Sequence, residues 1–107
     1  MKVKAAVVNA VNGPYEFEEL ELQELQANEV IVKLVASGIC HSDEALRVGD
    51  AEFPLPAVLG HEGAGMIEQV GAGVRDFQVG DQVVMAYNSC GTCPSCRTGH
   101  PSSCVSW

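Results

Sequence analysis

The sequence predicts a mainly β domain, a small barrel of antiparallel strands with one or two short helices and a loop held by four cysteines. Three observations carry this prediction. Short runs of β-type residues recur along the chain and are separated by Gly, Pro and Asn. One stretch, beginning near Ser42, has the signals of a helix. After Tyr87 the apolar periodicity stops and a cysteine-rich segment follows. The 107 residues suffice for one domain with a modest core.

The strands are expected between turn signals. The opening strand stops before Asn12-Gly13-Pro14, a sequence typical of turns. The next segment carries five glutamates among its leucines, which we interpret as the solvated face of a strand. The third is rich in Val and Ile, and the last two are joined across the Gly71–Gly73 turn. The expected strands are Lys2–Val8, Glu16–Leu25, Glu29–Ala36, Ala64–Val70 and Gln82–Tyr87.

A short helix is expected after the third strand. Ser42 offers an N-cap, two acidic residues follow it, and the helix would run through Leu46 to Val48 and end at Gly49. The next segment, Phe53-Pro54-Leu55-Pro56, cannot be a central strand because proline lacks the N–H that a ladder needs. We expect it to be a loop.

Charge and composition exclude several functions. The net charge is −8, with only six Lys plus Arg, whereas nucleic acid or an anionic membrane needs a basic face. The N-terminus lacks the apolar stretch of a secretory signal, and no segment has the length of a membrane helix. Reduced cysteines in metal-ligand spacing then indicate a cytoplasmic protein.

The most specific feature is the cysteine spacing C-x2-C-x2-C-x7-C. Four thiolates around one tetrahedral zinc, with Zn–S distances of about 2.3 Å, are the default interpretation. An iron–sulfur cluster of the bacterial type has a shorter last gap followed by Pro, where this chain has Val105. Two disulfides are also conceivable, although two-residue gaps strain a bridge between neighbours. The cysteines are Cys90, Cys93, Cys96 and Cys104.

A second group of metal-ligand types lies earlier in the chain. Cys40-His41-Ser42-Asp43 falls at the junction of the third strand and the helix, and Gly60-His61-Glu62-Gly63 follows later. A catalytic zinc takes three such ligands and keeps one position open. Taken singly, the cysteine could be a small buried apolar residue and the histidine an ordinary turn residue. Together with the cysteine quartet they indicate a narrower function.

These motifs resemble those of the zinc-dependent medium-chain alcohol dehydrogenases. Residues 38–43, Gly-Ile-Cys-His-Ser-Asp, are similar to the family's G-x-C-x-[ST]-D segment, and residues 60–65 to its G-H-E-x-x-G signature. Residues 79–83, Val-Gly-Asp-Gln-Val, and the cysteine lobe at residues 89–104 match in order and spacing. The lobe is most similar to aryl- and benzyl-alcohol members. The resemblance implies that residues 1–107 form a GroES-like barrel, the N-terminal catalytic domain.

The resemblance also assigns roles to residues. It implies that Cys40 and His61 bind the catalytic zinc and that Glu62 can coordinate it transiently. Ser42 would hydrogen-bond the alcohol and pass its proton outward, Asp43 would orient His61, and His41 would lie near the cofactor pyrophosphate. A histidine that ends this relay in some members is Ala45 here, so the outer relay must differ. Cys90, Cys93, Cys96 and Cys104 would hold a structural zinc.

The implied reaction is oxidation of small alcohols to aldehydes or ketones by zinc-assisted hydride transfer to NAD or NADP, in a full-length homodimer or homotetramer. The glycine-rich stretches here do not fit nucleotide loops, because Gly71-Ala72-Gly73 lacks the third glycine and residues 60–65 have the wrong order. We therefore expect the nucleotide-binding domain and the third catalytic zinc ligand to lie outside this chain. The chain alone should hold about one tight zinc, at the cysteine lobe, and oxidise no alcohol.

Two other functions are compatible with part of the sequence. A stand-alone zinc-binding interaction module would explain the cysteine lobe but not the paired Cys40 and His61 motifs. A co-chaperonin-like ring subunit would explain the barrel alone and none of the zinc ligands.

Overall fold

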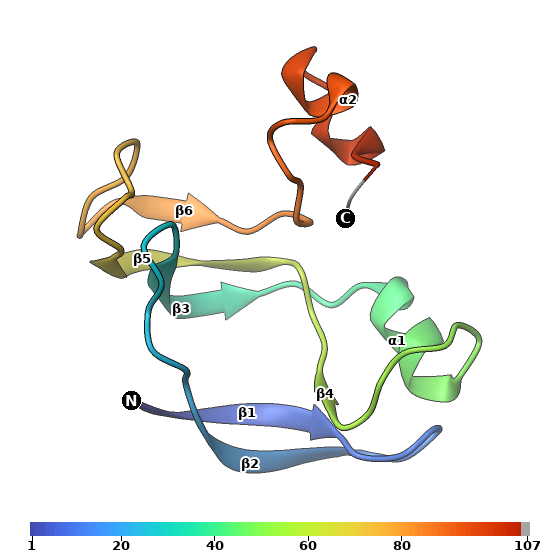
Figure 1. Ribbon diagram of the computed structural model, residues 1–107. Helices are drawn as coiled ribbons and strands as arrows, with labels where there is room; N and C mark the ends of the chain where they lie inside the picture. The colour runs from blue at the N-terminus through green and yellow to red at the C-terminus, as the bar shows by residue number, and fades with distance from the viewer. Residues whose placement is uncertain (106–107) are drawn as a thin grey trace.

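The computed structural model describes residues 1–105, and Figure 1 shows two layers of strands joined by loops, with the C-terminal lobe standing apart. The long strands coincide with the runs of β-type residues, and the short helices fall in the segments where those runs are interrupted. The elements are β1 (Lys2–Val8), β2 (Tyr15–Glu21), β3 (Val30–Ser37), α1 (His41–Val48), β4 (Ala57–Val58), β5 (Gly63–Val70), β6 (Gln82–Val84), α2 (Pro94–Arg97) and the 3₁₀ turn η1 (Pro101–Ser103).

The strands form two antiparallel three-stranded sheets, in the orders β2-β1-β4 and β3-β5-β6. In the first sheet, Val7 pairs with Val58 of β4. In the second, Val32 pairs with Ile67, and the register of β3 against β5 shifts at two places. The mainly β prediction with short helices and a cysteine lobe is confirmed.

Several element bounds differ from the expectation. Strand β2 stops at Glu21, four residues early, because its partner β1 begins at Lys2, which pairs with Glu21, and the bond from the Leu22 N–H to the Met1 carbonyl (2.9 Å) is the last between them. The last strand shortens to Gln82–Val84. Ser42 as N-cap is wrong: helix α1 starts at His41 with Cys40 as N-cap, and Ser42 bonds the Cys40 sulfur instead. The expected end at Gly49 is confirmed, with φ at 89° in the left-handed region.

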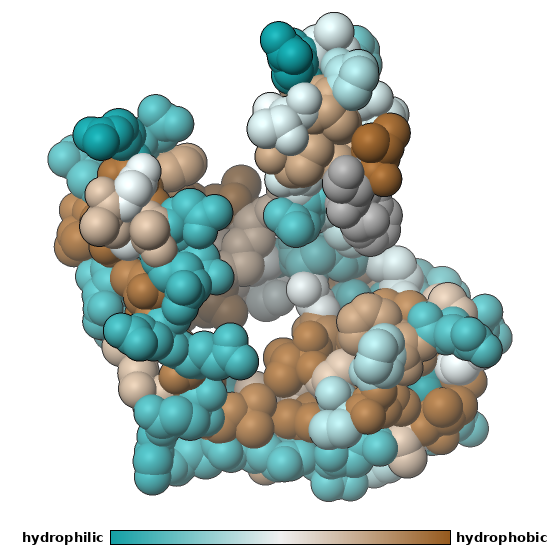
Figure 2. Space-filling view, in the orientation of Figure 1, coloured by the Kyte–Doolittle hydropathy of each residue, from teal (hydrophilic) through white to brown (hydrophobic). Residues whose placement is uncertain are grey.

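The core is small. Val7, Val8 and Ile67 are the buried aliphatic side chains among residues 1–105, and they come from the two central strands. Other apolar side chains on the second sheet and beyond it remain open, including Val84 at 81% exposed and Ile39 at 97%. Figure 2 shows a hollow between the two layers of strands in this view. Within the described part of the chain, no helix is long and apolar enough to cross a bilayer.

Helix α1 is tied to the turn between β1 and β2 through Arg47. Its guanidinium donates to both carboxylate oxygens of Glu44 and, at 2.8 Å, to the Gly13 carbonyl. The Arg47 carbonyl accepts from the Asn12 N–H at 2.6 Å. These bonds link the last turn of α1, the only longer helix of residues 1–105, to the first sheet, while the site residues lie at its first turn.

Candidate metal centres

Two strand ends bring the two separated ligand motifs together. Strand β3 ends at Ser37, just before Cys40, and β5 begins at Gly63, just after His61 and Glu62. Ser37 pairs with Gly63, and the Gly38 N–H donates to the Glu62 carbonyl at 3.0 Å. Because β3 and β5 are antiparallel neighbours, the end of one lies beside the start of the other.

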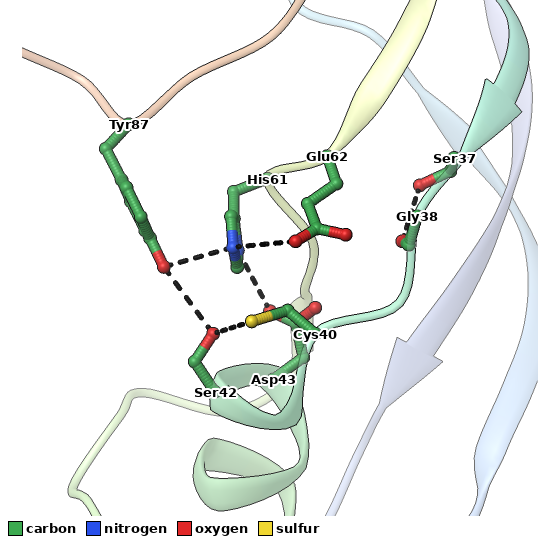
Figure 3. A network of polar contacts seen from close by, with 8 residues as sticks. All are labelled: Ser37, Gly38, Cys40, Ser42, Asp43, His61, Glu62 and Tyr87. Atoms are coloured by element: carbon green, nitrogen blue, oxygen red, sulfur yellow. Dashed lines mark hydrogen bonds and ion pairs between the residues drawn. The ribbon is translucent and has the colours of Figure 1, made fainter.

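Cys40, His61 and Glu62 form a group whose ligand atoms all lie within 4.8 Å of one another. Cys40 and His61 are half-buried, while the Glu62 side chain is 41% exposed. The Glu62 carboxylate lies 3.8 Å from Nε2 of His61. A thiol, an imidazole and a carboxylate are the donor types of a catalytic zinc site, and the group fits a metal ion of this kind. Figure 3 shows the three side chains converging between β3, β5 and α1.

Two residues of helix α1 support this group. Oδ1 of Asp43 lies 3.4 Å from Nδ1 of His61, and both side chains are largely buried, at 14% and 17% exposed. A carboxylate on one ring nitrogen fixes the tautomer and leaves the other, Nε2, for a ligand. The Ser42 hydroxyl donates to the Cys40 sulfur at 3.1 Å. The first turn of the helix thus supplies an orienting carboxylate to His61 and a hydroxyl to Cys40.

Tyr87 is a part of this site that the sequence did not indicate. Its hydroxyl lies 3.1 Å from Nε2 of His61 and 3.5 Å from the Ser42 hydroxyl (Figure 3). Its ring stacks on the imidazole. The signal that could have found it is strand register: Ala64 pairs with Val84, and continuing that register places Tyr87 opposite His61.

The four cysteines of the lobe also converge. The sulfurs of Cys90, Cys93, Cys96 and Cys104 lie within 4.8 Å of one another, and those of Cys90 and Cys96 are 4.0 Å apart. All are free, so neither disulfide forms. A tetrahedron with Zn–S bonds of about 2.3 Å has sulfurs about 3.8 Å apart, so the quartet fits a single ion.

Backbone N–H groups point at these sulfurs. The Cys93 and Thr92 N–H groups donate to the Cys90 sulfur at 3.2 and 3.4 Å. The Cys96 N–H donates to the sulfur of Cys93, the N-cap of α2, at 3.5 Å. The Cys90 N–H donates to the Cys104 sulfur at 3.3 Å. Such donors stabilise negative charge on sulfur, as a metal-binding thiolate requires.

The alcohol dehydrogenase GroES-like domain model matches residues 26–107. The chain belongs to this family. It is 43% identical to geraniol dehydrogenase of Castellaniella defragrans over 98% of its length, and 48% identical to the NDMA-dependent alcohol dehydrogenase of Amycolatopsis methanolica over 97%. The crystal structure of benzyl alcohol dehydrogenase from Acinetobacter calcoaceticus superposes with a TM-score of 0.94 at 45% identity, over 98% of this chain and 29% of that one.

The chain spans 28% of the length of both curated relatives. The resemblance to the zinc-type medium-chain alcohol dehydrogenases, with a benzyl-alcohol-type neighbour, is thus confirmed. The family model matches the second sheet, helix α1 and the lobe. This match favours an alcohol dehydrogenase domain over a co-chaperonin-like ring subunit, which would not need the metal-ligand groups.

The hydrogen bonds and the burial in the lobe shift the pKa values of its thiols in opposite directions. Hydrogen bonds from the backbone and the hydroxyl of Thr92, and then from the Cys93 N–H, lower the pKa of Cys90 to about 5. Donation from the Cys96 N–H lowers the pKa of Cys93. Burial raises the pKa of Cys96 to about 11. In this alcohol dehydrogenase domain, part of the lobe is therefore already anionic at neutral pH before any ion binds.

The remaining predicted residue of the site, His41, belongs to neither donor group. It is the first residue of α1, is exposed, and interacts electrostatically with Glu44, whose pKa it helps to lower after the larger effect of Arg47. The structure therefore brings together Cys40, Ser42, Asp43, His61 and Glu62, while His41 is exposed in the same helical turn.

Proposed function

We propose that residues 1–107 form the catalytic domain of an NAD(P)-dependent alcohol dehydrogenase that oxidises small alcohols to aldehydes or ketones. The observation that supports this most directly is the convergence of Cys40, His61 and Glu62, with their ligand atoms within 4.8 Å, in a chain of this family. Zinc bound there would act as a Lewis acid that lowers the pKa of an alcohol hydroxyl. The lobe would hold a second, structural zinc.

The chain's own residues divide the work around this site. Asp43 holds the imidazole of His61 through Nδ1, at 3.4 Å, so that Nε2 faces the ligand position. The Ser42 hydroxyl, within 3.1 Å of the Cys40 sulfur, lies where it can accept the proton of a bound alcohol and pass it on. Tyr87, 3.5 Å beyond it, is the next hydroxyl in the direction of solvent. Tyr87 is our candidate for the outer step of the proton relay, which the methyl side chain of Ala45 cannot perform.

We propose that most of the binding site for the nicotinamide nucleotide is formed by residues outside this chain. Every strand pair in residues 1–105 is antiparallel, whereas a dinucleotide fold is built on parallel strands with a glycine-rich turn. Gly71 and Gly73 are used otherwise, because their N–H groups donate to the carbonyls of Glu29 and Ala27 at 2.8 and 2.7 Å. His41, exposed at the first turn, is the residue of this chain that we propose to approach the cofactor pyrophosphate.

Two finer points belong to the same proposal. Five free cysteines support a reducing compartment, the cytoplasm. Exposed apolar side chains such as Val84 and Val35, at 81% and 74%, support burial against further protein in a homodimer or homotetramer of the full-length enzyme.

The test uses the full-length protein that contains this chain. Reduction of NAD or NADP is followed at increasing concentrations of a primary alcohol, for the native protein and for Ser42→Ala and Ser42→Thr. Loss of general acid–base assistance should lower kcat by about 100-fold in Ser42→Ala, while Ser42→Thr, which keeps a hydroxyl, retains most of it. Equal kcat in the native protein and Ser42→Ala would refute the role of Ser42. Absence of any nucleotide reduction with alcohols would refute the proposed function.

A further inference from the structure

The Glu62 carboxylate rests directly against the backbone of Gly38, as Figure 3 shows. A methyl group on Gly38 would overlap Oε2 of Glu62, and it would lie 3.0 Å from Cβ and 3.2 Å from Cδ of the same side chain. The two residues also share a backbone hydrogen bond, from the Gly38 N–H to the Glu62 carbonyl at 3.0 Å. The space that a side chain at position 38 would fill is therefore occupied by the carboxylate.

The backbone conformation does not demand glycine at this position. The φ angle of Gly38 lies outside the left-handed region, in contrast to Gly49 and Gly60 at 89° and 126°. An alanine could adopt the same backbone without strain. What glycine provides at position 38 is room, and the group that uses this room is the one carboxylate among the three donors.

We propose that Gly38 is a positioning residue for the metal site, which leaves the space in which the Glu62 carboxylate is held beside Cys40 and His61. The inference rests on the proposed function, because it takes these three residues as metal ligands. Glu62 directly precedes β5 and Gly38 directly follows β3, so the pairing of Ser37 with Gly63 holds the two residues next to each other. Oε1 then faces Nε2 of His61, at 3.8 Å.

A side chain at position 38 would displace the Glu62 carboxylate. The carboxylate is the far end of a flexible side chain that is 41% exposed, so it can turn toward solvent. The strand pairing involves backbone atoms and would stay. Gly38→Ala should therefore leave the fold intact and remove the carboxylate from the donor group, with the same effect on metal binding as truncation of Glu62.

The experiment measures cobalt(II) binding to the full-length protein that contains this chain, after one equivalent of zinc has filled the four-cysteine lobe. The absorbance of a thiolate-to-cobalt band, weakened in Cys40→Ser, reports the second site. The variants are Gly38→Ala, Glu62→Ala and the double variant. Gly73→Ala is the matched control, because its methyl group would also meet a neighbour at 3.0 Å, the Ala27 carbonyl, and its φ is likewise outside the left-handed region.

The dissociation constant for cobalt should rise about tenfold in Gly38→Ala and in Glu62→Ala, and stay at the native value in Gly73→Ala. In the double variant it should equal that of Glu62→Ala, because Gly38 acts only through Glu62. A native-like constant in Gly38→Ala would overturn the inference and leave the proposed function standing. So would a further loss in the double variant, which would mean general distortion. Absence of a Cys40-dependent band in the native full-length protein would overturn both.

Discussion

The phenol ring of Tyr87 lies nearly flat against the imidazole of His61, with the ring centroids 4.3 Å apart and 21° between the planes. The stacking covers one face of a candidate metal ligand, and the tyrosine hydroxyl reaches 3.1 Å from its Nε2. The segment that follows β6 thereby contributes to a site whose other residues lie in α1 and next to the ends of β3 and β5. Two substitutions separate the contribution of the ring from that of the hydroxyl.

Tyr87→Phe removes the hydroxyl and keeps the ring, whereas Tyr87→Ala removes both. The free energy of unfolding in urea should fall by at most about 1 kcal/mol in Tyr87→Phe, because a partly exposed hydrogen bond contributes little. In Tyr87→Ala it should fall by a further 0.5–1.5 kcal/mol or so, the value of an aromatic pair. Equal loss in the two variants would show that the ring stacking on His61 contributes nothing.

The lobe should show unequal thiol reactivity when chelator has removed its metal. With a pKa of about 5, Cys90 is a thiolate at pH 7, whereas Cys96, with a pKa of about 11, is a thiol. Iodoacetamide should modify Cys90 roughly tenfold faster, after allowing for the weaker nucleophilicity of a low-pKa thiolate. Peptide mapping by mass spectrometry measures both rates.

The control for this reactivity is Thr92→Val. It removes the hydroxyl that lies 3.6 Å from the Cys90 sulfur and keeps the backbone N–H. The pH at which Cys90 begins to react should rise in this variant. Faster modification of Cys96 than of Cys90 at pH 7 would contradict the arrangement of donors around the lobe.

The ion pair between Arg47 and Glu44 in helix α1 predicts that the pKa of Glu44 depends on Arg47. The Arg47 guanidinium, through its hydrogen bonds, holds the pKa of Glu44 below its ordinary value of 4.5. The stabilisation of the folded state by the Arg47–Glu44 pair is therefore complete above pH 4.5, and it is lost as the pH falls through the lowered pKa of Glu44. In Arg47→Gln the midpoint of Glu44, followed by NMR of its carboxyl carbon, should rise toward 4.5, while Arg97→Gln on α2 leaves it unchanged. An unchanged midpoint in Arg47→Gln would contradict the ion pair.

The buried cysteines of the lobe should be indispensable for its zinc. Cys93 is 8% exposed and serves as the N-cap of α2, so Cys93→Ser should reduce lobe zinc from about one per chain to near zero and lower resistance to urea. Cys40→Ser should leave lobe zinc unchanged, since it lies in the other donor group. Zinc content after gel filtration measures both, and retention of zinc by Cys93→Ser would contradict a four-thiolate site.

The local pattern of the sequence predicted those parts of the fold that local chemistry determines. Strand β1 follows its run of apolar residues, and α1 ends where Gly49 can take a positive φ. The start of α1 was not predicted correctly, because the Ser42 hydroxyl bonds the sulfur of Cys40, two residues earlier, in place of the helix N–H groups that an N-cap serine would bind. The four-residue helix α2 lies in a segment whose fold is set by cysteine convergence and not by periodicity.

The donor residues of the site could be predicted because the Cys40 and His61 motifs occur together with the cysteine quartet in one chain, although each motif alone has an ordinary structural explanation. Tyr87 and Gly38 could not, for two different reasons. The place of Tyr87 depends on the register of β6 against β5, which single-sequence patterns do not define. The importance of Gly38 depends on where the Glu62 side chain lies, and glycine after a strand is otherwise an ordinary turn residue.

Anomalous diffraction at the zinc edge, from crystals of the full-length protein that contains this chain, grown with zinc, tests the central claim most directly. Two peaks are expected per subunit, one among the sulfurs of Cys90, Cys93, Cys96 and Cys104 and one between Cys40 and His61. The second should disappear in Cys40→Ser while the first remains. A native full-length protein with a zinc peak at the lobe and none between Cys40 and His61 would contradict the claim.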